Sequence, residues 1–239
     1  MLLDADDSQL VLVDYQTRLM PVIFEHEIVV ANALRLARMA RIMDVPVWGT
    51  AQNPDKLGQN LPELQAAIDS AGGKTMAKMH FSAAAEGLVE WLRPPVRKAP
   101  TGGNARSLPK HLQKPVEPEE EGRSMIVMAG CEAHVCLMQT ALELLEEEFD
   151  VWVVTDACSS RSERNRDAAF DRLAGNGAEL VTTEMVVFEW ARTCEHDAFR
   201  ELLALVKYVR FALEVTDSRL PLAASTGRLR AVRAPIDGI

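Results

Sequence analysis

The sequence predicts an α/β protein with three layers (α/β/α), in which a mainly parallel sheet lies between two layers of helices. Three observations lead to this prediction. Short, uninterrupted apolar runs are typical of strands that are covered on both faces. These runs alternate with segments whose apolar residues recur at helical spacing, which indicates βαβ units. The composition, with 48% hydrophobic and 26% charged residues, is that of an ordinary globular protein.

Six segments are expected to form strands: residues 10–13, 45–50, about 73–78, 125–130, 151–154 and 178–182. Helices are expected between them, where apolar residues recur three or four positions apart. The first covers the stretch from Val30 to Ala40, and a second covers residues 81–92 with Ser82 as its N-cap. A third contains Leu137 and Leu145. The capping box Ser160-x-x-Glu163 predicts a helix that runs through Leu173, and Phe199 to Val206 mark the last helix.

The 239 residues suffice for one sizeable core, and residues 1–212 are expected to form a single domain. Two stretches interrupt the pattern. Residues 93–123 are rich in Pro, Gly, Lys and Glu, which predicts a surface insertion that serves as a lid, an oligomer contact or a flexible loop. The tail at 213–239 is irregular. It either is disordered or crosses onto a neighbouring subunit, and the sequence leaves both alternatives open.

Charge and composition exclude several classes of protein. The formal net charge of −9 argues against a nucleic-acid-binding surface. No apolar stretch reaches the roughly 18 residues of a membrane-spanning helix, and the acidic start does not resemble a secretion signal. The four cysteines include no Cys-x-x-Cys pair, so they are expected to be reduced thiols. We therefore expect a cytoplasmic protein.

Three chemically active residues stand at or just beyond the carboxyl ends of predicted strands, where parallel sheets place their active sites. They are Asp14, Lys78 and Cys136. A carboxylate can accept the proton of a thiol, and an ammonium favours the resulting anion. Each residue also has an ordinary structural explanation, as a turn carboxylate, a surface charge or a small buried side chain. From spacing alone, a catalytic site and these structural roles are about equally supported.

Five motifs together resemble the isochorismatase-like cysteine hydrolases, which are related to nicotinamidases and N-carbamoyl amidases. The motifs are Leu10-Val11-Leu12-Val13-Asp14-Tyr15-Gln16, Thr50-Ala51-Gln52-Asn53-Pro54, Lys78-Met79-His80-Phe81-Ser82, Gly130-Cys131-Glu132-Ala133-His134-Val135-Cys136 and Asp156-Ala157-Cys158-Ser159-Ser160-Arg161. The resemblance covers about residues 8–205 apart from the insertion. The wording of the fourth motif is similar to that of the subgroup called isochorismatase-domain proteins.

This resemblance implies a Rossmann-like fold with a six-stranded sheet in the order 3-2-1-4-5-6. It also implies that Asp14 is the general base, that Lys78 stabilises the thiolate, which lowers the thiol pKa, and that Cys136 is the nucleophile. The family has a non-proline cis peptide that maps to Cys131–Glu132. There, the backbone N–H of Glu132 would join that of Cys136 in an oxyanion hole.

The sequence departs from two relatives in the superfamily. Nicotinamidases bind a metal through a motif with two histidines after the second strand, whereas the segment from Gln52 to Gly58 contains no histidine. We therefore expect no metal and no cofactor. Isochorismatases that cleave a vinyl ether commonly lack the cysteine, so Cys136 favours acyl transfer. Six residues are candidates for the substrate pocket: Gln16, Gln52, Asn53, His80, Phe81 and His134. Gln52 and Asn53 are equally plausible as turn residues, and a structural or surface role is favoured for the two histidines.

The expected function is hydrolysis of a small carbonyl substrate, an amide, through a thioester on Cys136 and without a metal. The alternatives are a vinyl-ether hydrolase and a catalytically silent binding or scaffolding module on the same fold. The expected partners are a small-molecule substrate and further copies of the chain, in a dimer or tetramer. Neither nucleic acid nor membrane is expected to bind.

Overall fold

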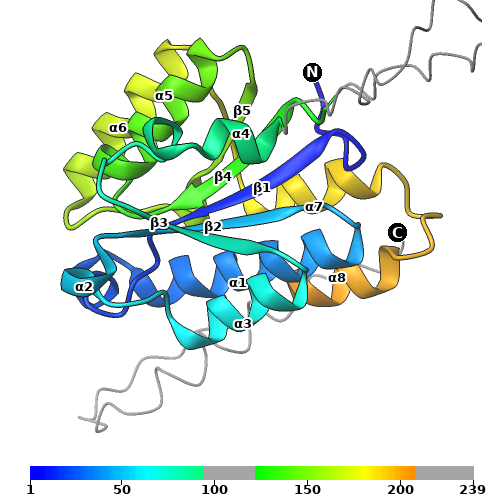
Figure 1. Ribbon diagram of the computed structural model, residues 1–239. Coiled ribbons are helices and arrows are strands. Elements are labelled where there is room, and N and C mark those ends of the chain that lie inside the picture. Colours follow the sequence, from blue (N-terminus) through cyan, green and yellow to red (C-terminus); the bar gives the residue numbers. More distant parts are fainter. Residues whose placement is uncertain (94–121, 208–239) are drawn as a thin grey trace, which may run out of the picture. The chain divides into compact units, whose positions relative to one another are not determined.

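Six parallel strands form one sheet in the order β3-β2-β1-β4-β5-β6 (Figure 1). The computed structural model describes residues 1–93 and 122–207. The strands are β1 Ser8–Val13, β2 Val47–Gln52, β3 Lys74–Lys78, β4 Met125–Gly130, β5 Asp150–Val154 and β6 Glu179–Val181. This arrangement confirms the predicted fold class. β1 and β4 are central, and all their residues are buried, which explains their unbroken apolar runs.

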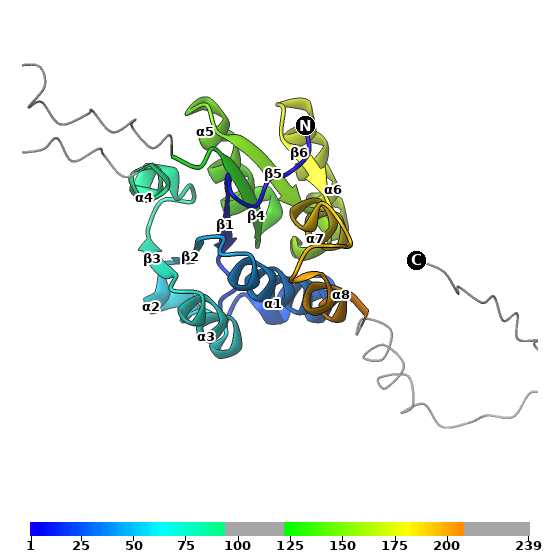
Figure 2. The same ribbon diagram turned by 90° about the vertical axis from the view of Figure 1, so that its right-hand side faces the viewer.

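Helices cover both faces of the sheet. α1 and α3 lie on one face with α8, and α4, α5 and α6 lie on the other (Figures 1 and 2). The helices are α1 His26–Ile42, α2 Pro54–Leu57, α3 Pro62–Ser70, α4 Leu88–Leu92, α5 Met138–Glu146, α6 Glu163–Gly175, α7 Thr183–Ala191 and α8 Phe199–Lys207. Shorter helical turns are η1 Met20–Val22, η2 Ala84–Glu86, η5 Ala133–Leu137 and η6 Thr155–Ala157. Among the described residues, no helix combines the length and apolar character that crossing a membrane requires.

The predicted helix at 81–92 is wrong as a single element. It consists of η2 and α4, which are separated by Gly87. Gly87 has a φ of +99°, a left-handed conformation that ends one helical turn and that glycine adopts without a steric penalty. Ser82 is nevertheless close to its predicted role, because its Oγ accepts a hydrogen bond from the N–H of Ala84 at 3.2 Å.

The N-cap of α6 is Ser162, two residues after the predicted Ser160. The Oγ of Ser162 accepts from the N–H of Asn165 at 3.4 Å. The Ser160 hydroxyl instead contacts Nδ1 of His134 at 2.9 Å. Because of this tertiary contact, Ser160 does not cap the helix as predicted. Three helices, α2, α3 and α7, were not predicted. Their sequence signals are short: Pro54 and Pro62 in the first turns of α2 and α3, and Thr182 as the N-cap of α7.

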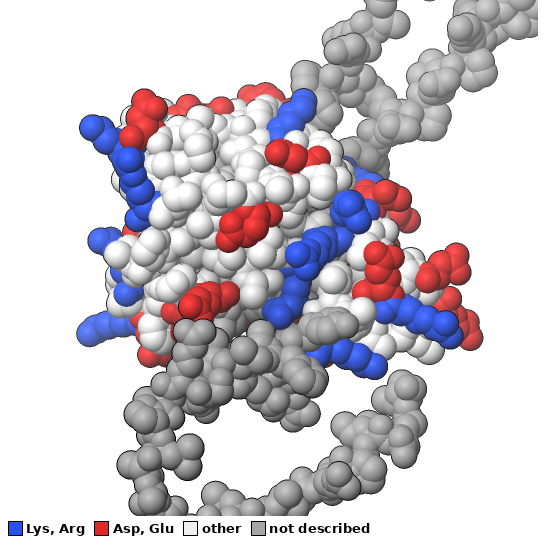
Figure 3. Space-filling view, turned by 90° about the horizontal axis from the view of Figure 1, so that it is seen from below, with Lys and Arg blue, Asp and Glu red and all other residues white. Residues whose placement is uncertain are grey.

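Close packing joins the ends of β1 and β4. A Cβ added to Gly130 would overlap the backbone oxygen of Val13, so only glycine fits at this position. Cys131 and Cys158 are buried, and Cys194 is exposed. The predicted surface insertion and the predicted tail fall almost entirely on residues 94–121 and 208–239, outside the described residues. On the face that carries α1 and α3, basic and acidic side chains are intermixed where the surface is visible (Figure 3).

Candidate active site

The carboxyl ends of β1, β2 and β3 and the turn after β4 bring the predicted triad together. Asp14 follows β1, Lys78 is the last residue of β3, and Cys136 lies in the helical turn η5 that follows β4. β1 and β4 are neighbours at the point where the strand order reverses, which is the usual position of a site in an open parallel sheet. The last residue of β2 is Gln52, which pairs in register with Lys78.

A fully buried ion pair forms the centre of this cluster. Lys78 Nζ lies 2.8 Å from Asp14 Oδ2, and neither side chain is exposed to solvent. The hydroxyl of Thr50 donates to the other carboxylate oxygen, Oδ1, at 2.7 Å. Buried charges persist only when they are paired and hydrogen-bonded, and both carboxylate oxygens meet this requirement. Thr50 was not among the predicted site residues, although it precedes Gln52 by two positions and therefore lies on the same face of β2.

Asp14 has an unusual backbone conformation, with a φ of +56°. Residues other than glycine seldom adopt this left-handed region, although Asp and Asn adopt it more readily than most. The backbone oxygen of Asp14 accepts from the N–H of Gln16 at 2.9 Å, which closes a tight turn directly after β1. Such conformations often occur at functional sites, where the surrounding structure holds them in place.

The Lys78 ammonium has short contacts to three different acceptors. Besides Asp14, it donates to Gln52 Oε1 at 2.6 Å and to the backbone oxygen of Phe81 at 2.9 Å. A longer contact of 3.4 Å reaches the backbone oxygen of His80. Three short acceptors match the three hydrogens of an ammonium, so its orientation is fixed.

The Cys136 thiol is nearly enclosed, with 6% of the residue exposed. Its Sγ lies 3.9 Å from Gln52 Oε1. Burial and, to a smaller extent, the negative charge of Asp14 raise the pKa of this thiol to about 12, although the positive charge of Lys78 acts in the opposite direction. Lys78 thus lowers the thiol pKa, which is the predicted direction, but the effect of burial is larger. The role of Lys78 in stabilising the thiolate stays a prediction.

The peptide bond between Cys131 and Glu132 is cis, as the resemblance implied. The following N–H, of Ala133, donates to the backbone oxygen of Ser159 at 2.8 Å. For the N–H of Glu132, the structure shows no acceptor within the described part of the chain. The oxyanion hole made of the Glu132 and Cys136 N–H groups stays a prediction.

Of the pocket candidates, only Gln52 reaches the triad through its side chain. Gln16 is completely buried, and its amide binds the backbone oxygens of Gln52 and Gly58 at 2.9 and 2.6 Å, which is a structural role. Asn53 is half-buried and left-handed, and its backbone N–H donates to the backbone oxygen of Lys78 at 2.8 Å.

The remaining candidates lie at the margin of the cluster. The side chain of His80 is 70% exposed and pairs with Glu86 at 2.9 Å. Backbone N–H groups of His80 and Met79, together with the His80 ring, lower the pKa of Glu86 to about 2. Phe81 is 53% exposed and reaches Lys78 through its backbone oxygen only. His134 contacts Ser160, as described above. Glu86, which sequence reasoning missed, therefore fixes the loop after β3 and does not contact the triad.

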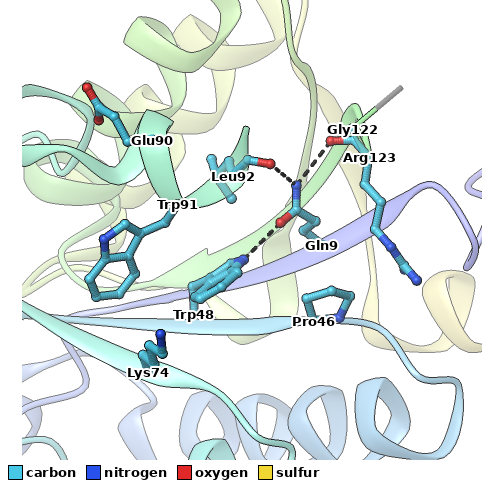
Figure 4. Close-up of a pocket in the computed structure, with 9 residues that line it drawn as sticks. All are labelled: Gln9, Pro46, Trp48, Lys74, Glu90, Trp91, Leu92, Gly122 and Arg123. Carbon is cyan, nitrogen blue, oxygen red and sulfur yellow. Dashed lines mark hydrogen bonds between the residues drawn. The ribbon is translucent and has the colours of Figure 1, made fainter. Parts of the chain in front are cut away.

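A hollow lies elsewhere, between α4 and the amino-terminal ends of the first three strands (Figure 4). It measures about 450 Å³. The rings of Trp48 and Trp91 lie 5.6 Å apart at its wall, and the Trp48 Nε1 donates to Gln9 Oε1 at 2.9 Å. Because the strands are parallel, their amino-terminal ends lie at the edge opposite Asp14 and Cys136. This hollow is therefore separate from the candidate active site.

Comparisons with known proteins agree with the fold and with the motifs. Residues 111–185 match the family model of the isochorismatase domain. The solved structure of the MAR1 ribonuclease from Caenorhabditis elegans is 25% identical, with a TM-score of 0.73, and the match covers 94% of this chain and 100% of that one. The YcaC gene product of Escherichia coli, described as an octameric hydrolase of unknown specificity, is also 25% identical, with a TM-score of 0.72 over 91% and 97% of the two chains.

Isochorismatase domain-containing protein 2A from mouse is 32% identical over 205 residues, which cover 84% of each chain. The corresponding protein 2 from zebrafish (Danio rerio) is also 32% identical, over 86% of this chain and 90% of its own. Both matches extend over most of this chain and over most of the relative. The chain belongs to the isochorismatase domain family.

Proposed function

We propose that the protein is a cysteine hydrolase that cleaves a small amide through a thioester on Cys136. The observation that supports this most directly is the buried ion pair between Asp14 and Lys78, at 2.8 Å, with Gln52 linking the ammonium to the thiol. A base, a cation and a nucleophile thus share one enclosed site. Membership of the isochorismatase domain family supports a hydrolase, and so does the neighbouring hydrolase from Escherichia coli.

In the proposed first step, Cys136 Sγ attacks the substrate carbonyl and its proton passes to Asp14. A carbon–sulfur bond forms, and the carbonyl oxygen becomes an anion that the N–H groups of Glu132 and Cys136 would bind. Removal of one such donor raises the barrier by about 2.7–4 kcal/mol in comparable sites. Asp14 then gives its proton to the leaving nitrogen, and the carbon–nitrogen bond breaks.

In the second step, a water molecule gives a proton to Asp14 and attacks the thioester carbonyl. The carbon–sulfur bond breaks, the acid leaves, and the proton returns to the sulfur. The raised thiol pKa indicates that the proton leaves during the attack and not before it. Lys78 then neutralises the sulfur anion only while it exists.

Assays of a panel of small amides with wild-type protein and with Cys136→Ala test this proposal. We expect Cys136→Ala to abolish hydrolysis while the far-UV circular dichroism spectrum is unchanged. Equal hydrolysis of an amide by both proteins would contradict the thioester mechanism. Equal cleavage of a vinyl ether added to the panel would favour a vinyl-ether hydrolase, which needs no thiol. No hydrolysis by either protein would favour a silent binding module.

We also propose that the chain forms a homo-oligomer and that its substrate is a small molecule. The octameric neighbour supports the assembly. The neighbour described as a ribonuclease adds a short RNA to the substrate panel. The net charge of −9 gives no support to RNA as the substrate. Size-exclusion chromatography with light scattering measures the oligomeric state, and a monomer would contradict the first part of the proposal.

A further inference from the structure

The backbone and side-chain polar groups of Gln52 all have hydrogen-bond partners within the protein. Its backbone N–H donates to Gln16 Oε1, and its backbone oxygen accepts from Gln16 Nε2, both at 2.9 Å. Its side-chain Nε2 donates to the backbone oxygen of Met79 at 2.8 Å. Its Oε1 accepts from Lys78 Nζ at 2.6 Å and lies 3.9 Å from Cys136 Sγ. The side-chain oxygen is therefore already engaged before any substrate binds.

Only one orientation of the Gln52 amide is compatible with these partners. A backbone oxygen such as that of Met79 only accepts, and the Lys78 ammonium only donates. A flipped amide would direct its NH₂ group at the ammonium and its oxygen at another oxygen. The carbonyl of Gln52 is thus held toward the ammonium and the sulfur, and the residue is 8% exposed.

This oxygen accepts a hydrogen bond from one of the three ammonium hydrogens of Lys78. The other two hydrogens are matched by Asp14 Oδ2 at 2.8 Å and by the backbone oxygen of Phe81 at 2.9 Å. Gln52 therefore competes with Cys136 for the ammonium hydrogens, and the contact of Lys78 with the thiol lowers the thiol pKa by less than burial raises it. The thiol itself is placed to donate to the same Gln52 oxygen. An oxygen that accepts the thiol hydrogen favours the neutral form of Cys136.

We propose that Gln52 is a positioning residue, whose side-chain oxygen holds the Lys78 ammonium and the Cys136 thiol hydrogen in the resting site. When the thiol proton passes to Asp14, Gln52 loses one of its two donors. The ammonium hydrogen that it still holds then lies beside the new sulfur anion. This inference rests on the proposed role of Cys136 as the nucleophile. It assigns Gln52 to the thiol and not to recognition of the substrate amide.

Alkylation by iodoacetamide tests the proposal, with peptide mass spectrometry to identify the labelled cysteine. In Gln52→Met, the side chain has similar length but no oxygen, so one ammonium hydrogen becomes available to the sulfur. A hydrogen bond to a charged group of this kind corresponds to about one pH unit, so we expect Cys136 to react about tenfold faster at pH 8. Gln59→Met, at an exposed glutamine, is the matched control and should leave the rate unchanged.

Gln52→Glu gives the opposite expectation, because it keeps the size and adds a negative charge beside the sulfur. We expect Cys136 to react about tenfold more slowly in this variant. A merely structural role predicts a looser site, in which the buried Cys131 and Cys158 also become reactive in both variants. The rate for the exposed Cys194 serves as the internal reference.

Wild-type rates at Cys136 in both variants would overturn the proposal, and so would faster labelling of all three buried cysteines. If Gln52→Met fails to fold, the slower reaction expected of Gln52→Glu still tests it. Alkylation needs no turnover, so failure of the proposed function gives a different result. In that case the amide panel shows no hydrolysis while the two variants still shift the rates in opposite directions.

Discussion

Replacement of Asp14 by Asn should destabilise the fold strongly, because it leaves the Lys78 ammonium buried without its counter-charge. Both side chains are completely enclosed, and their charged atoms are 2.8 Å apart. Breaking a buried pair on one side typically costs about 3–5 kcal/mol. For a chain of this size, that corresponds to a fall in melting temperature of about 6–20 °C. Asn also tolerates the left-handed backbone at this position, so the change isolates the charge.

Urea unfolding, monitored by circular dichroism, measures the loss in the free energy of unfolding. A double-mutant cycle assigns this loss to the Asp14–Lys78 pair. Lys78→Met removes the ammonium and keeps a long apolar side chain. If the loss comes from the uncompensated charge, the double variant Asp14→Asn/Lys78→Met should be more stable than Asp14→Asn alone. Additive losses from the two single changes would refute this reasoning, because they would show that the two groups do not interact energetically.

Three further predictions concern the cap of α6, the junction of β1 and β4, and the thiol. Ser162→Ala should lower the free energy of unfolding by about 1 kcal/mol in urea titrations, because the N–H of Asn165 loses its acceptor; an unchanged midpoint would show that Ser162 is not the cap. Gly130→Ala should cost about 3 kcal/mol or more, because the new Cβ overlaps the backbone oxygen of Val13, and melting temperature is the measurement. A melting temperature equal to that of the wild type would contradict this overlap. The pKa of Cys136 is raised to about 12, so below that value its alkylation rate should rise about tenfold per pH unit. A plateau below about pH 9 would contradict the raised pKa.

The central part of the fold could be predicted because its signals are local. The apolar runs of β1 and β4 coincide with the strands, and the placement of Asp14 and Cys136 at one edge of a parallel sheet follows from topology alone. Predicted helix boundaries failed where a tertiary contact decided between two equal local signals. Ser160 and Ser162 are both good caps, and the side chain of His134, distant in sequence, engages the former.

Details of the site were less predictable, because they depend on which side chains lie across neighbouring strands. Thr50 looks like an ordinary residue within a strand until β1 and β2 are in register. The two histidines near the triad attracted a functional interpretation by sequence distance, yet His80 is exposed and His134 binds Ser160. The motifs show the proximity of the thiol to a lysine, whereas the extent of burial, which has the larger effect on the thiol pKa, is visible only in the structure.

Lys78 belongs to β3, one of the two edge strands of the sheet, which pairs with β2 alone. The free energy of local opening is typically lower for an edge strand than for the strands in the centre of a sheet. A brief detachment of β3 would remove the cation from the cluster while β1 and β4 kept the carboxylate and the sulfur in place. The integrity of the Asp14–Lys78–Cys136 cluster therefore depends on how firmly this edge strand is held, and amide hydrogen exchange along β3 would measure how often the strand separates without global unfolding.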